Sequence, residues 1–368
     1  MSDIKAAFTN LWNRLSVFFT RRVVEGVFLR KQAERFYLVF GGHLFFQTLN
    51  AACRFDLFTL LANEPGLTRQ EIAHRLGIDE QPARIMLLGL VASGLLRKAQ
   101  SRYYNTYVSR ELLTRQSSRN VLPYVALQHH VMYRGMTHFY DAIKTYSNAG
   151  LSEFRGDEPT IYQRLTHDPE VEQVFHDAMS VLSNQTNATL ARFVDLSHVR
   201  HLIDVGGGDA TTLITLAKRF PHLQGSVFDL PSVCEIARKK VQDAGLVDRI
   251  SAIEGNAFND HFPRNADAFL FAHFCTIWSA EKNRHLLKKA YDALPPGGIV
   301  IVFNMMQADD ETGPLSAAVG SPYFLTIATG EGMLYTWQEY EQWIKDAGFS
   351  KVRRCVLPRD HGAVIGTK

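Results

Sequence analysis

The sequence is poor in the patterns that mark extracellular, membrane-bound or metal-binding proteins. Its 368 residues include only four cysteines, and no cysteine, histidine or carboxylate group has the spacing of a disulfide framework or a metal site. Sparse cysteines are typical of a reducing compartment, so we expect a cytoplasmic protein without a bound metal. No apolar run reaches the roughly 18 residues of a membrane span, and we expect no membrane partner. With 40 basic and 37 acidic residues the formal net charge is +3, which predicts no nucleic-acid partner.

The most informative feature that is present is a run of three glycines after a short apolar segment. Residues 202–205 predict a buried strand, and residues 206–208 form a turn without β-carbons, which a ligand can approach closely. Apolar residues at helical spacing predict a helix over 211–220. The next predicted strand, 226–230, contains Asp229, about 20 residues beyond the glycines, where a carboxylate commonly holds ribose hydroxyls. We therefore expect a nucleoside cofactor over the ends of these strands.

The turn lacks the third glycine of the dinucleotide-binding fingerprint. Asp209 follows it, at the point where a pyrophosphate would bind, and this argues against NAD. Asp204, near the end of the first strand, suits a positively charged cofactor instead. S-adenosylmethionine carries a sulfonium and an ammonium but no phosphate. It is the cofactor we expect, with Asp204, Gly206, Gly208 and Asp229 among its contacts.

Further segments, read in order, resemble the class I S-adenosylmethionine-dependent O-methyltransferases that act on small molecules in plants and in bacterial secondary metabolism. They are residues 202–208, 228–231, 255–258, Trp278, 293–298, 335–340 and 347–349. The resemblance implies a homodimer with interlocked N-terminal segments, a small-molecule acceptor, and cofactor contacts at Ser183, Leu230, Asn256 and Ala257. Where the family has an acid that reads the adenine amino group, this chain has Asn256, whose side-chain oxygen can accept the same hydrogen bond.

The sequence divides into two predicted domains. Residues 1–117 are mostly helical and contain a winged-helix pattern. The helix that would enter a DNA groove offers only one glutamine and one arginine, so we favour a dimerisation domain over a DNA-binding one. Residues 1–35 mix apolar and basic side chains, and we favour a helix swapped across a dimer over a helix lying on a membrane.

Residues 118–368 form the predicted catalytic domain, with a helical lid over 118–197 and an α/β core over 198–368. Strands alternate with helices in this core, which indicates a Rossmann-like, doubly wound, seven-stranded sheet. The last two predicted strands, 351–356 and 362–366, have no helix between them, so they should pair antiparallel. The other predicted strands are 201–205, 226–230, 250–254, 267–273 and 299–304.

The catalytic positions implied by the resemblance are changed. The family has a histidine that takes a phenolic proton at the position of Thr276, and glutamates at positions that align with Asn304 and Leu334. A threonine hydroxyl does not take up a proton near neutral pH. Either the acceptor is already nucleophilic, or another side chain serves as the base.

Candidates for the changed site come from the lid and from the strand ends. We take as candidate catalytic residues His129, His130, His138 and Thr276. Acceptor contacts are expected at Tyr133, Met179, Asn304 and Tyr323, and a further cofactor contact is expected at His273.

These observations favour an S-adenosylmethionine-dependent methyltransferase that acts on an aromatic or otherwise planar small molecule. The changed base position shifts the expectation from ordinary O-methylation toward C-methylation or an unusual acceptor. Two alternatives stay open at this stage. One is a different reaction on the same fold, such as hydroxylation, cyclisation or a pericyclic step, and the other is a non-catalytic binding module.

Overall fold

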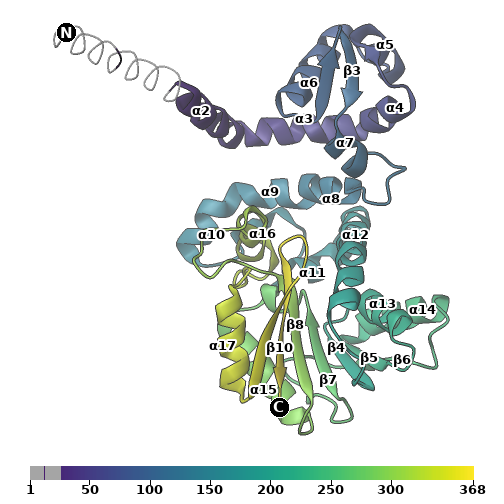
Figure 1. The fold of residues 1–368 in the computed structure, drawn as a ribbon, viewed down its shortest axis with the longest axis vertical. Coiled ribbons are helices and arrows are strands. Elements are labelled where there is room, and N and C mark those ends of the chain that lie inside the picture. Colours follow the sequence, from purple (N-terminus) through teal and green to yellow (C-terminus); the bar gives the residue numbers. More distant parts are fainter. Residues whose placement is uncertain (1–11, 13–25) are drawn as a thin grey trace, which may run out of the picture. The chain divides into compact units, whose positions relative to one another are not determined.

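The computed structural model describes residue 12 and residues 26–368. These residues fall into two compact units, which divide between Leu122 and Pro123 (Figure 1). Most of the predicted N-terminal helix within residues 1–35 lies outside the described residues. No described helix is long and apolar enough to cross a membrane.

The first unit is a set of helices around a small three-stranded sheet, in which the strands pair antiparallel in the order β1-β3-β2. Helix α5 begins at a capping box: the Glu71 N–H donates to Thr68 Oγ1 (3.3 Å) and the Thr68 N–H donates to the Glu71 carboxylate (2.7 Å). The elements are α2 (Gly26–Phe40), α3 (Gly42–Arg54), α4 (Leu57–Asn63), β1 (Leu67–Thr68), α5 (Arg69–Leu76), α6 (Glu80–Ala92), β2 (Leu96–Ala99), β3 (Arg102–Asn105) and α7 (Tyr107–Leu112).

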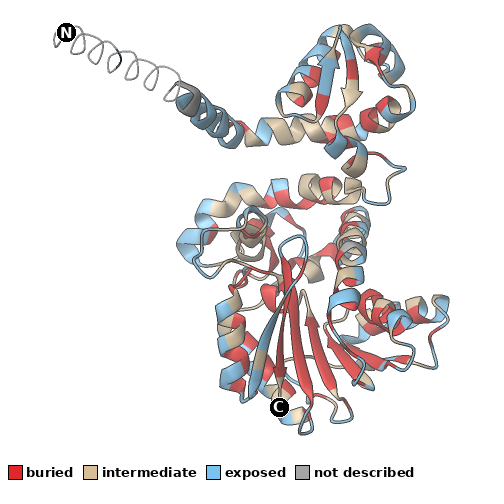
Figure 2. Cartoon of the chain, viewed as in Figure 1, coloured by how far each residue is buried: buried red, intermediate tan, exposed pale blue. Residues whose placement is uncertain are grey.

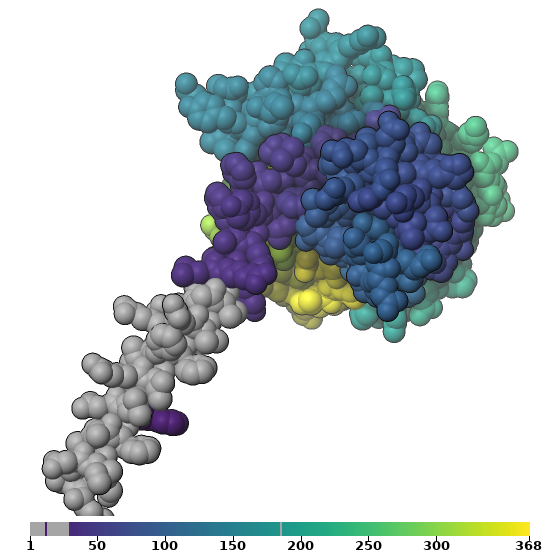
Figure 3. Space-filling view, turned by 90° about the horizontal axis from the view of Figure 1, so that it is seen from above, coloured from purple at the N-terminus to yellow at the C-terminus, as the bar shows by residue number. Residues whose placement is uncertain are grey.

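Helix α2 is exposed along its described length. Every residue from 29 to 40 is exposed, and in the space-filling view α2 is the dark purple segment that leads into α3 (Figure 3). A solvated helix of a lone chain is expected to be polar, yet much of this surface is apolar. Its exposed apolar side chains are Leu29, Phe36, Tyr37, Leu38, Val39 and Phe40.

The second unit opens with the helical segment that the sequence predicted as a lid. Its segments η2 and α12, together with the segment η7 between α16 and α17, share a buried cluster that includes Val131, Phe175 and Ile327. Two segments of this cluster are π-helical, a form often found at functional sites. The elements are α8 (Leu122–Leu127), η2 (Gln128–Met132), α9 (Tyr133–Gly135), η3 (Met136–His138), α10 (Phe139–Thr145), η4 (Ala149–Glu153), α11 (Ile161–Arg164), η5 (Leu165–His167) and α12 (Pro169–Phe193).

A seven-stranded sheet follows, in the order β6-β5-β4-β7-β8-β10-β9. Strand β10 lies antiparallel to both β8 and β9, which confirms the predicted doubly wound sheet with a reversed last strand. The elements are β4 (His201–Val205), α13 (Thr211–Arg219), β5 (Gln224–Asp229), α14 (Pro231–Asp243), β6 (Ile250–Glu254), β7 (Ala268–Ala272), η6 (Cys275–Ile277), α15 (Ala280–Ala293), β8 (Ile299–Met305), α16 (Leu315–Tyr323), η7 (Phe324–Ala328), α17 (Trp337–Ala347), β9 (Lys351–Val356) and β10 (His361–Thr367).

Both faces of this sheet are covered, as parallel strands require (Figure 2). Successive side chains alternate between two buried clusters, so Leu202 packs on one face and Ile203 on the other. The first cluster includes α12 and α13, and the second includes α15 and α17. The strand ends between these layers are therefore held rigidly.

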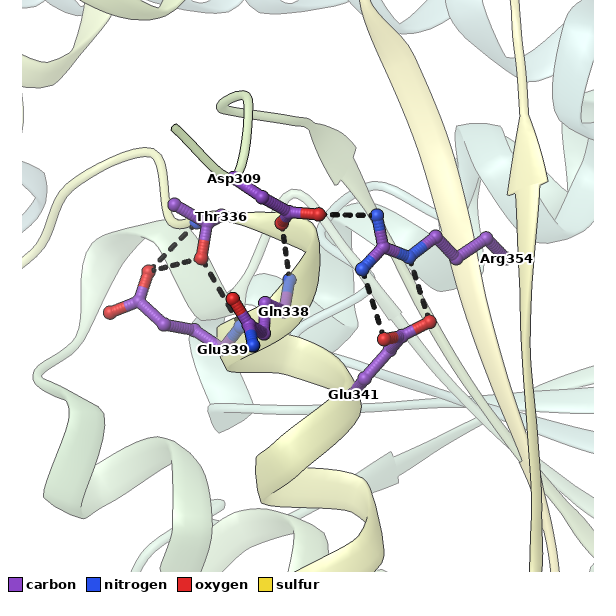
Figure 4. A network of polar contacts seen from close by, with 6 residues as sticks. All are labelled: Asp309, Thr336, Gln338, Glu339, Glu341 and Arg354. Carbon is purple, nitrogen blue, oxygen red and sulfur yellow. Dashed lines mark hydrogen bonds and ion pairs between the residues drawn. The ribbon is translucent and has the colours of Figure 1, made fainter. Parts of the chain in front are cut away.

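A polar network fixes the far edge of the sheet near the start of α17 (Figure 4). The Arg354 guanidinium on β9 donates to both carboxylate oxygens of Glu341 (2.7 and 3.0 Å) and to Asp309 (2.6 Å). Asp309 also accepts from the N–H of Gln338 (2.8 Å). Because Asp309 follows β8, the network ties the loop beyond that strand to α17 and β9.

Candidate active site at the carboxyl ends of the strands

The glycine turn joins β4 to α13 and leaves no room for a side chain at Gly206 or Gly207. Gly206 and Gly208 have φ angles of 67° and 57°, which glycine adopts without strain. A Cβ on Gly206 would lie 2.2 Å from the Phe274 ring, and a Cβ on Gly207 would lie 2.9 Å from the Asp204 carboxylate. The turn is thus wedged between the end of β4 and the segment that follows β7.

Asp229, at the end of β5, braces this turn from the neighbouring strand. Its Oδ2 accepts from the Gly208 N–H (3.0 Å), and its Oδ1 accepts from the Leu230 N–H (2.8 Å). Burial raises the pKa of the carboxyl, and these two bonds oppose the rise. Each oxygen accepts one bond and keeps capacity for another, so the carboxylate can hold two hydroxyls of a ribose.

Asp204 is a buried carboxylate without a hydrogen-bond partner among the described residues. Its side chain is fully buried, and neither of its oxygens has a donor. Burial raises its pKa well above the ordinary value, and the nearby carboxylates of Asp229 and Asp209 add to the rise. Such a group is costly to ionise unless a cation comes close. This arrangement fits a positively charged cofactor.

Asp209 does not contribute a free negative charge to the turn. Its carboxylate pairs with the Lys240 ammonium and accepts from the Thr211 hydroxyl (2.6 Å). Burial alone would raise the pKa of Asp209, but the bonds to Lys240 and Thr211 lower it. The sequence suggested that Asp209 repels a pyrophosphate, whereas in the structure Lys240 neutralises it.

Asn256 has its side-chain oxygen engaged within its own turn. Its Oδ1 already accepts from the backbone N–H groups of Phe258 (2.9 Å) and Asn259 (3.4 Å). An adenine amino group would therefore share this oxygen with the two backbone donors. The Nδ2 group of the same side chain is a hydrogen-bond donor. Ala257 beside it is half-buried, and Leu230 is 44% exposed.

Thr276 is enclosed by its own turn. It is buried, and its hydroxyl donates to the carbonyl of His273 (3.3 Å). The loop at Gly332 closes over it, since a Cβ there would lie 2.2 Å from the Thr276 carbonyl oxygen. The hydroxyl at the predicted base position therefore has a local structural partner.

His273 follows β7 directly, in the left-handed region at φ 55°, which is unusual for a residue with a side chain. Its Nε2 lies 3.4 Å from Thr186 Oγ1 on α12, and its ring packs against Phe303 (4.9 Å between centroids) and His361 (5.4 Å). Burial lowers the pKa of His273 to about 3, and His361 adds to this effect. His273 is therefore neutral at physiological pH.

His361 was not among the site residues predicted from the sequence, because it directly precedes the last predicted strand, 362–366. It begins β10, where it pairs in register with Met305 at the end of β8. Its Nδ1–H donates to the Arg359 carbonyl (2.7 Å), and burial lowers its pKa. The antiparallel return of the last strand is the signal that could have placed it at this edge.

Asn304 does not share this face of the sheet. It is fully buried, and its Nδ2 donates to the Tyr340 hydroxyl (3.2 Å) in the core beside α17. Phe303, its neighbour on β8, packs on the opposite face with His273. The predicted acceptor contact at Asn304 is thus a core residue, because side chains alternate along the strand.

The lid candidates lie in different surroundings. The rings of His129 and His130 meet edge to face on η2 (4.9 Å), whereas His138 pairs with Glu153 (2.9 Å) in a partly exposed position. Tyr133 is 38% exposed.

Met179 and Tyr323 pack against one buried cluster, and Ser183 lies half-buried one helical turn after Met179 on α12. Burial raises the pKa of Tyr323 well above its ordinary value, with Tyr162 adding to the effect.

Comparison with known proteins identifies the family to which this chain belongs. Residues 137–350 match the O-methyltransferase domain, and residues 37–115 match the O-methyltransferase dimerisation domain. The chain belongs to the O-methyltransferase family. It is an S-adenosylmethionine-dependent methyltransferase.

Relatives of this methyltransferase cover nearly its whole length. L-tyrosine C(3)-methyltransferase of Streptomyces lavendulae is 39% identical over 336 residues, covering 90% of this chain and 92% of the relative. 3-hydroxy-5-methyl-1-naphthoate 3-O-methyltransferase of Streptomyces sahachiroi is 35% identical, covering 88% and 91%. The apo crystal structure of the S-adenosylmethionine-dependent methyltransferase SibL matches with a TM-score of 0.82 at 36% identity, covering 90% of this chain and 98% of that one. Human N-acetylserotonin methyltransferase with bound S-adenosylmethionine matches with a TM-score of 0.77 at 25% identity, covering 92% and 98%.

Proposed function

We propose that this methyltransferase places the methyl group on a ring carbon beside the hydroxyl of a tyrosine-like phenol. The observation that carries the proposal is the enclosed threonine at the family's base position. Thr276 is buried and bonded to the carbonyl of His273, so this position offers no base for ordinary phenol O-methylation. The 39% identity to an L-tyrosine C(3)-methyltransferase supports the same acceptor class.

The residues around the glycine turn suit the cofactor side of this reaction. When bound, S-adenosylmethionine supplies an electrophilic methyl group on a positively charged sulfur. Asp229 would hold the ribose hydroxyls, and the bare backbone of Gly206 and Gly208 would face the methionine part. Asp204 would stabilise the positive charge, because its buried carboxylate has no donor within the described residues.

The acceptor side is proposed to lie between α12 and the π-helical segments η2 and η7. Met179 and Tyr323 would contact the flat faces of an aromatic ring there, with Tyr133 nearer the solvent. A phenol suits this site because its ring carbons next to the hydroxyl are electron-rich. Proximity and desolvation supply much of the rate of an in-line methyl transfer.

Product analysis tests the proposal directly. The protein is incubated with S-adenosylmethionine and L-tyrosine or simpler para-substituted phenols, and the position of the new methyl group is read by NMR. We expect an aryl methyl signal and loss of one ring proton beside the hydroxyl. A methoxy signal would instead establish O-methylation, the reaction named for the naphthoate relative.

We also propose that the enzyme is a cytoplasmic homodimer built through α2 and the rest of the dimerisation domain. The uncovered apolar side of α2 supports the dimer, because a second copy would remove it from water. All four cysteines are free thiols, which suits a reducing compartment. Light scattering at micromolar concentration should give twice the chain mass, and a monomer there overturns the dimer.

A further inference from the structure

We propose that His273 receives the hydroxyl proton of the acceptor, and that Thr186 and His361 are the residues that position its ring. This inference rests on the proposed phenolic acceptor. It assigns a proton-accepting group to a site whose expected base position holds Thr276 instead.

His273 lies between the glycine turn and the helical lid. Phe274, the next residue, lies against Gly206, where a Cβ would come within 2.2 Å of its ring. In the other direction the His273 ring reaches Thr186 on α12, one turn beyond Ser183. The side chain is only half-buried, although it lies among core elements. A residue so placed can touch an acceptor held over the cofactor.

The hydrogen bonds of Thr186 fix which ring nitrogen carries the proton. The Thr186 hydroxyl hydrogen is directed to the Leu182 carbonyl (3.0 Å), with the Ser183 carbonyl at 3.3 Å. With its hydrogen so directed, the Thr186 oxygen accepts from His273, and Nε2 then carries the ring hydrogen. In this tautomer the Nδ1 atom has a lone pair. This is the atom that can accept a phenolic proton.

The surroundings keep this lone pair available. Phe303 from β8 and His361 from β10 pack against the ring, and Thr186 faces it from α12. The only titratable group within the described residues that shifts the pKa of His273 is His361, and burial is the larger cause. His361 is held in one tautomer by the Arg359 carbonyl and has a lowered pKa itself. Both rings are neutral at neutral pH, so Nδ1 is not blocked by a proton.

The charges balance during the reaction. The ring carbon beside the hydroxyl bonds to the methyl group, the methyl–sulfur bond breaks with its electron pair left on sulfur, and the hydroxyl proton moves to His273 Nδ1. The positive charge lost at sulfur reappears on the imidazole, so the number of charges in the site does not change. The methylated carbon then loses its hydrogen to water as a proton, and His273 returns a proton to the oxygen. The net products are the methylated phenol, the demethylated cofactor and one proton.

The test compares His273→Asn with wild type on a series of ring-fluorinated phenols of decreasing pKa. We expect kcat/KM for the unsubstituted phenol to fall by roughly 10²–10⁴-fold, and the deficit to shrink as the acceptor becomes ionised without help. His285→Asn, an exposed histidine on α15, is the matched control and should behave as wild type. An equal deficit on every acceptor, or a deficit below about threefold, overturns the proposal.

Thr186 gives a second route that does not depend on the folding of the first variant. Thr186→Val removes the oxygen that accepts from Nε2–H and should lower kcat more than it raises KM, whereas Thr186→Ser should restore most of kcat. If the valine and serine variants behave alike, the positioning role is wrong.

A binding measurement separates this inference from the proposed function. In ¹⁵N-histidine-labelled protein with the demethylated cofactor, a phenol should shift one Nδ1 signal that is absent from His273→Asn, and the O-methyl ether of that phenol should not. An unshifted signal at saturating phenol contradicts the inference. Because no turnover occurs, the result holds whether the methyl group ends on carbon or on oxygen.

Discussion

At the scale of single residues, the site is dominated by charges that burial makes costly. Asp204 has no partner within the described part of the chain, Asp229 is held by two backbone donors, and Asp209 is neutralised by Lys240. Three carboxylates so close together cannot all stay ionised cheaply in a partly dry site. A cationic ligand would lower the cost of ionising these carboxylates, and its binding should depend on pH through Asp204 and Asp229.

Asp229→Ala tests the ribose contact. Two charge-assisted hydrogen bonds of about 1.5–3 kcal/mol each are lost, so the affinity for S-adenosylmethionine should drop at least tenfold. Isothermal titration calorimetry measures this drop, and the demethylated product should show the same loss because it carries the same ribose. Asp243→Ala, at the end of α14, serves as control and should bind as wild type. Unchanged affinity in Asp229→Ala would refute the assignment.

Asp204 predicts a pH dependence with a definite sign. Its pKa is raised in the folded protein by burial, with Asp229 and Asp209 contributing, so the folded state holds the proton more tightly than the unfolded chain. The free energy of unfolding of the cofactor-free protein therefore decreases as pH rises from the ordinary carboxyl range through the raised pKa, because the contribution of Asp204 is lost. A bound cation favours the ionised form, so affinity for S-adenosylmethionine should increase over the same window.

Asp204→Asn should remove both effects. The variant should have a higher Tm than wild type at neutral pH without cofactor, and its affinity should change less with pH than that of wild type. Thermal unfolding and calorimetry across the pH range measure these quantities. An affinity that climbs with pH as steeply in the variant as in wild type would show that another group is responsible.

At the scale of elements, the glycine turn allows two reasons for a glycine to be tested apart: a positive φ angle and the lack of space for a side chain. Gly206 and Gly208 both have positive φ, so a side chain at either position is strained. Only at Gly206 does a Cβ collide with a neighbour, the Phe274 ring, whereas nothing lies within 4 Å of a Cβ at Gly208. The two positions therefore distinguish backbone strain from steric contact.

We expect Gly206→Ala to be the more damaging of the two alanine substitutions. It must displace Phe274 and with it His273, so cofactor affinity and kcat should both fall by more than tenfold relative to Gly208→Ala. Differential scanning fluorimetry and steady-state kinetics on both variants give the comparison. Equal losses would mean that strain alone governs the turn.

The glycine turn and the elements around it could be predicted from the sequence. Several contacts made by the site residues could not, for physical reasons. The strand–glycine–helix pattern and the acid after the second strand depend on neighbouring residues, so the turn and the position of Asp229 could be predicted. The contact between His273 and His361 could not, because it depends on β10 entering the sheet beside β8. The partners of Asn304 and of Asn256 Oδ1 likewise depend on packing and on turn geometry that the residue type does not specify.

At the scale of the whole molecule, a single chain does not explain why the apolar side chains of α2 are exposed. Val39 is 83% exposed and Phe40 is 68% exposed, although each belongs to a residue type that is usually buried. In the proposed dimer this surface lies in the contact between copies. A charge placed there should disturb association while leaving each chain folded.

Val39→Asp tests this. We expect a dimer that dissociates on dilution into the micromolar range or below, because burying an unpaired carboxylate costs several kcal/mol. Analytical ultracentrifugation reports the shift, and circular dichroism checks the fold. Val247→Asp, at another exposed valine (60%), is the control and should remain dimeric. A Val39→Asp protein that stays dimeric at nanomolar concentration would move the interface elsewhere.

The position of β10 also has a consequence for synthesis. This strand is made after β9 yet lies between β9 and β8, so the sheet cannot close until the ribosome has passed residue 367. Until then β8 presents an open, almost wholly apolar edge, which is the kind of surface that recruits other chains. We therefore expect nascent or prematurely terminated chains to be prone to association until the last strand is made.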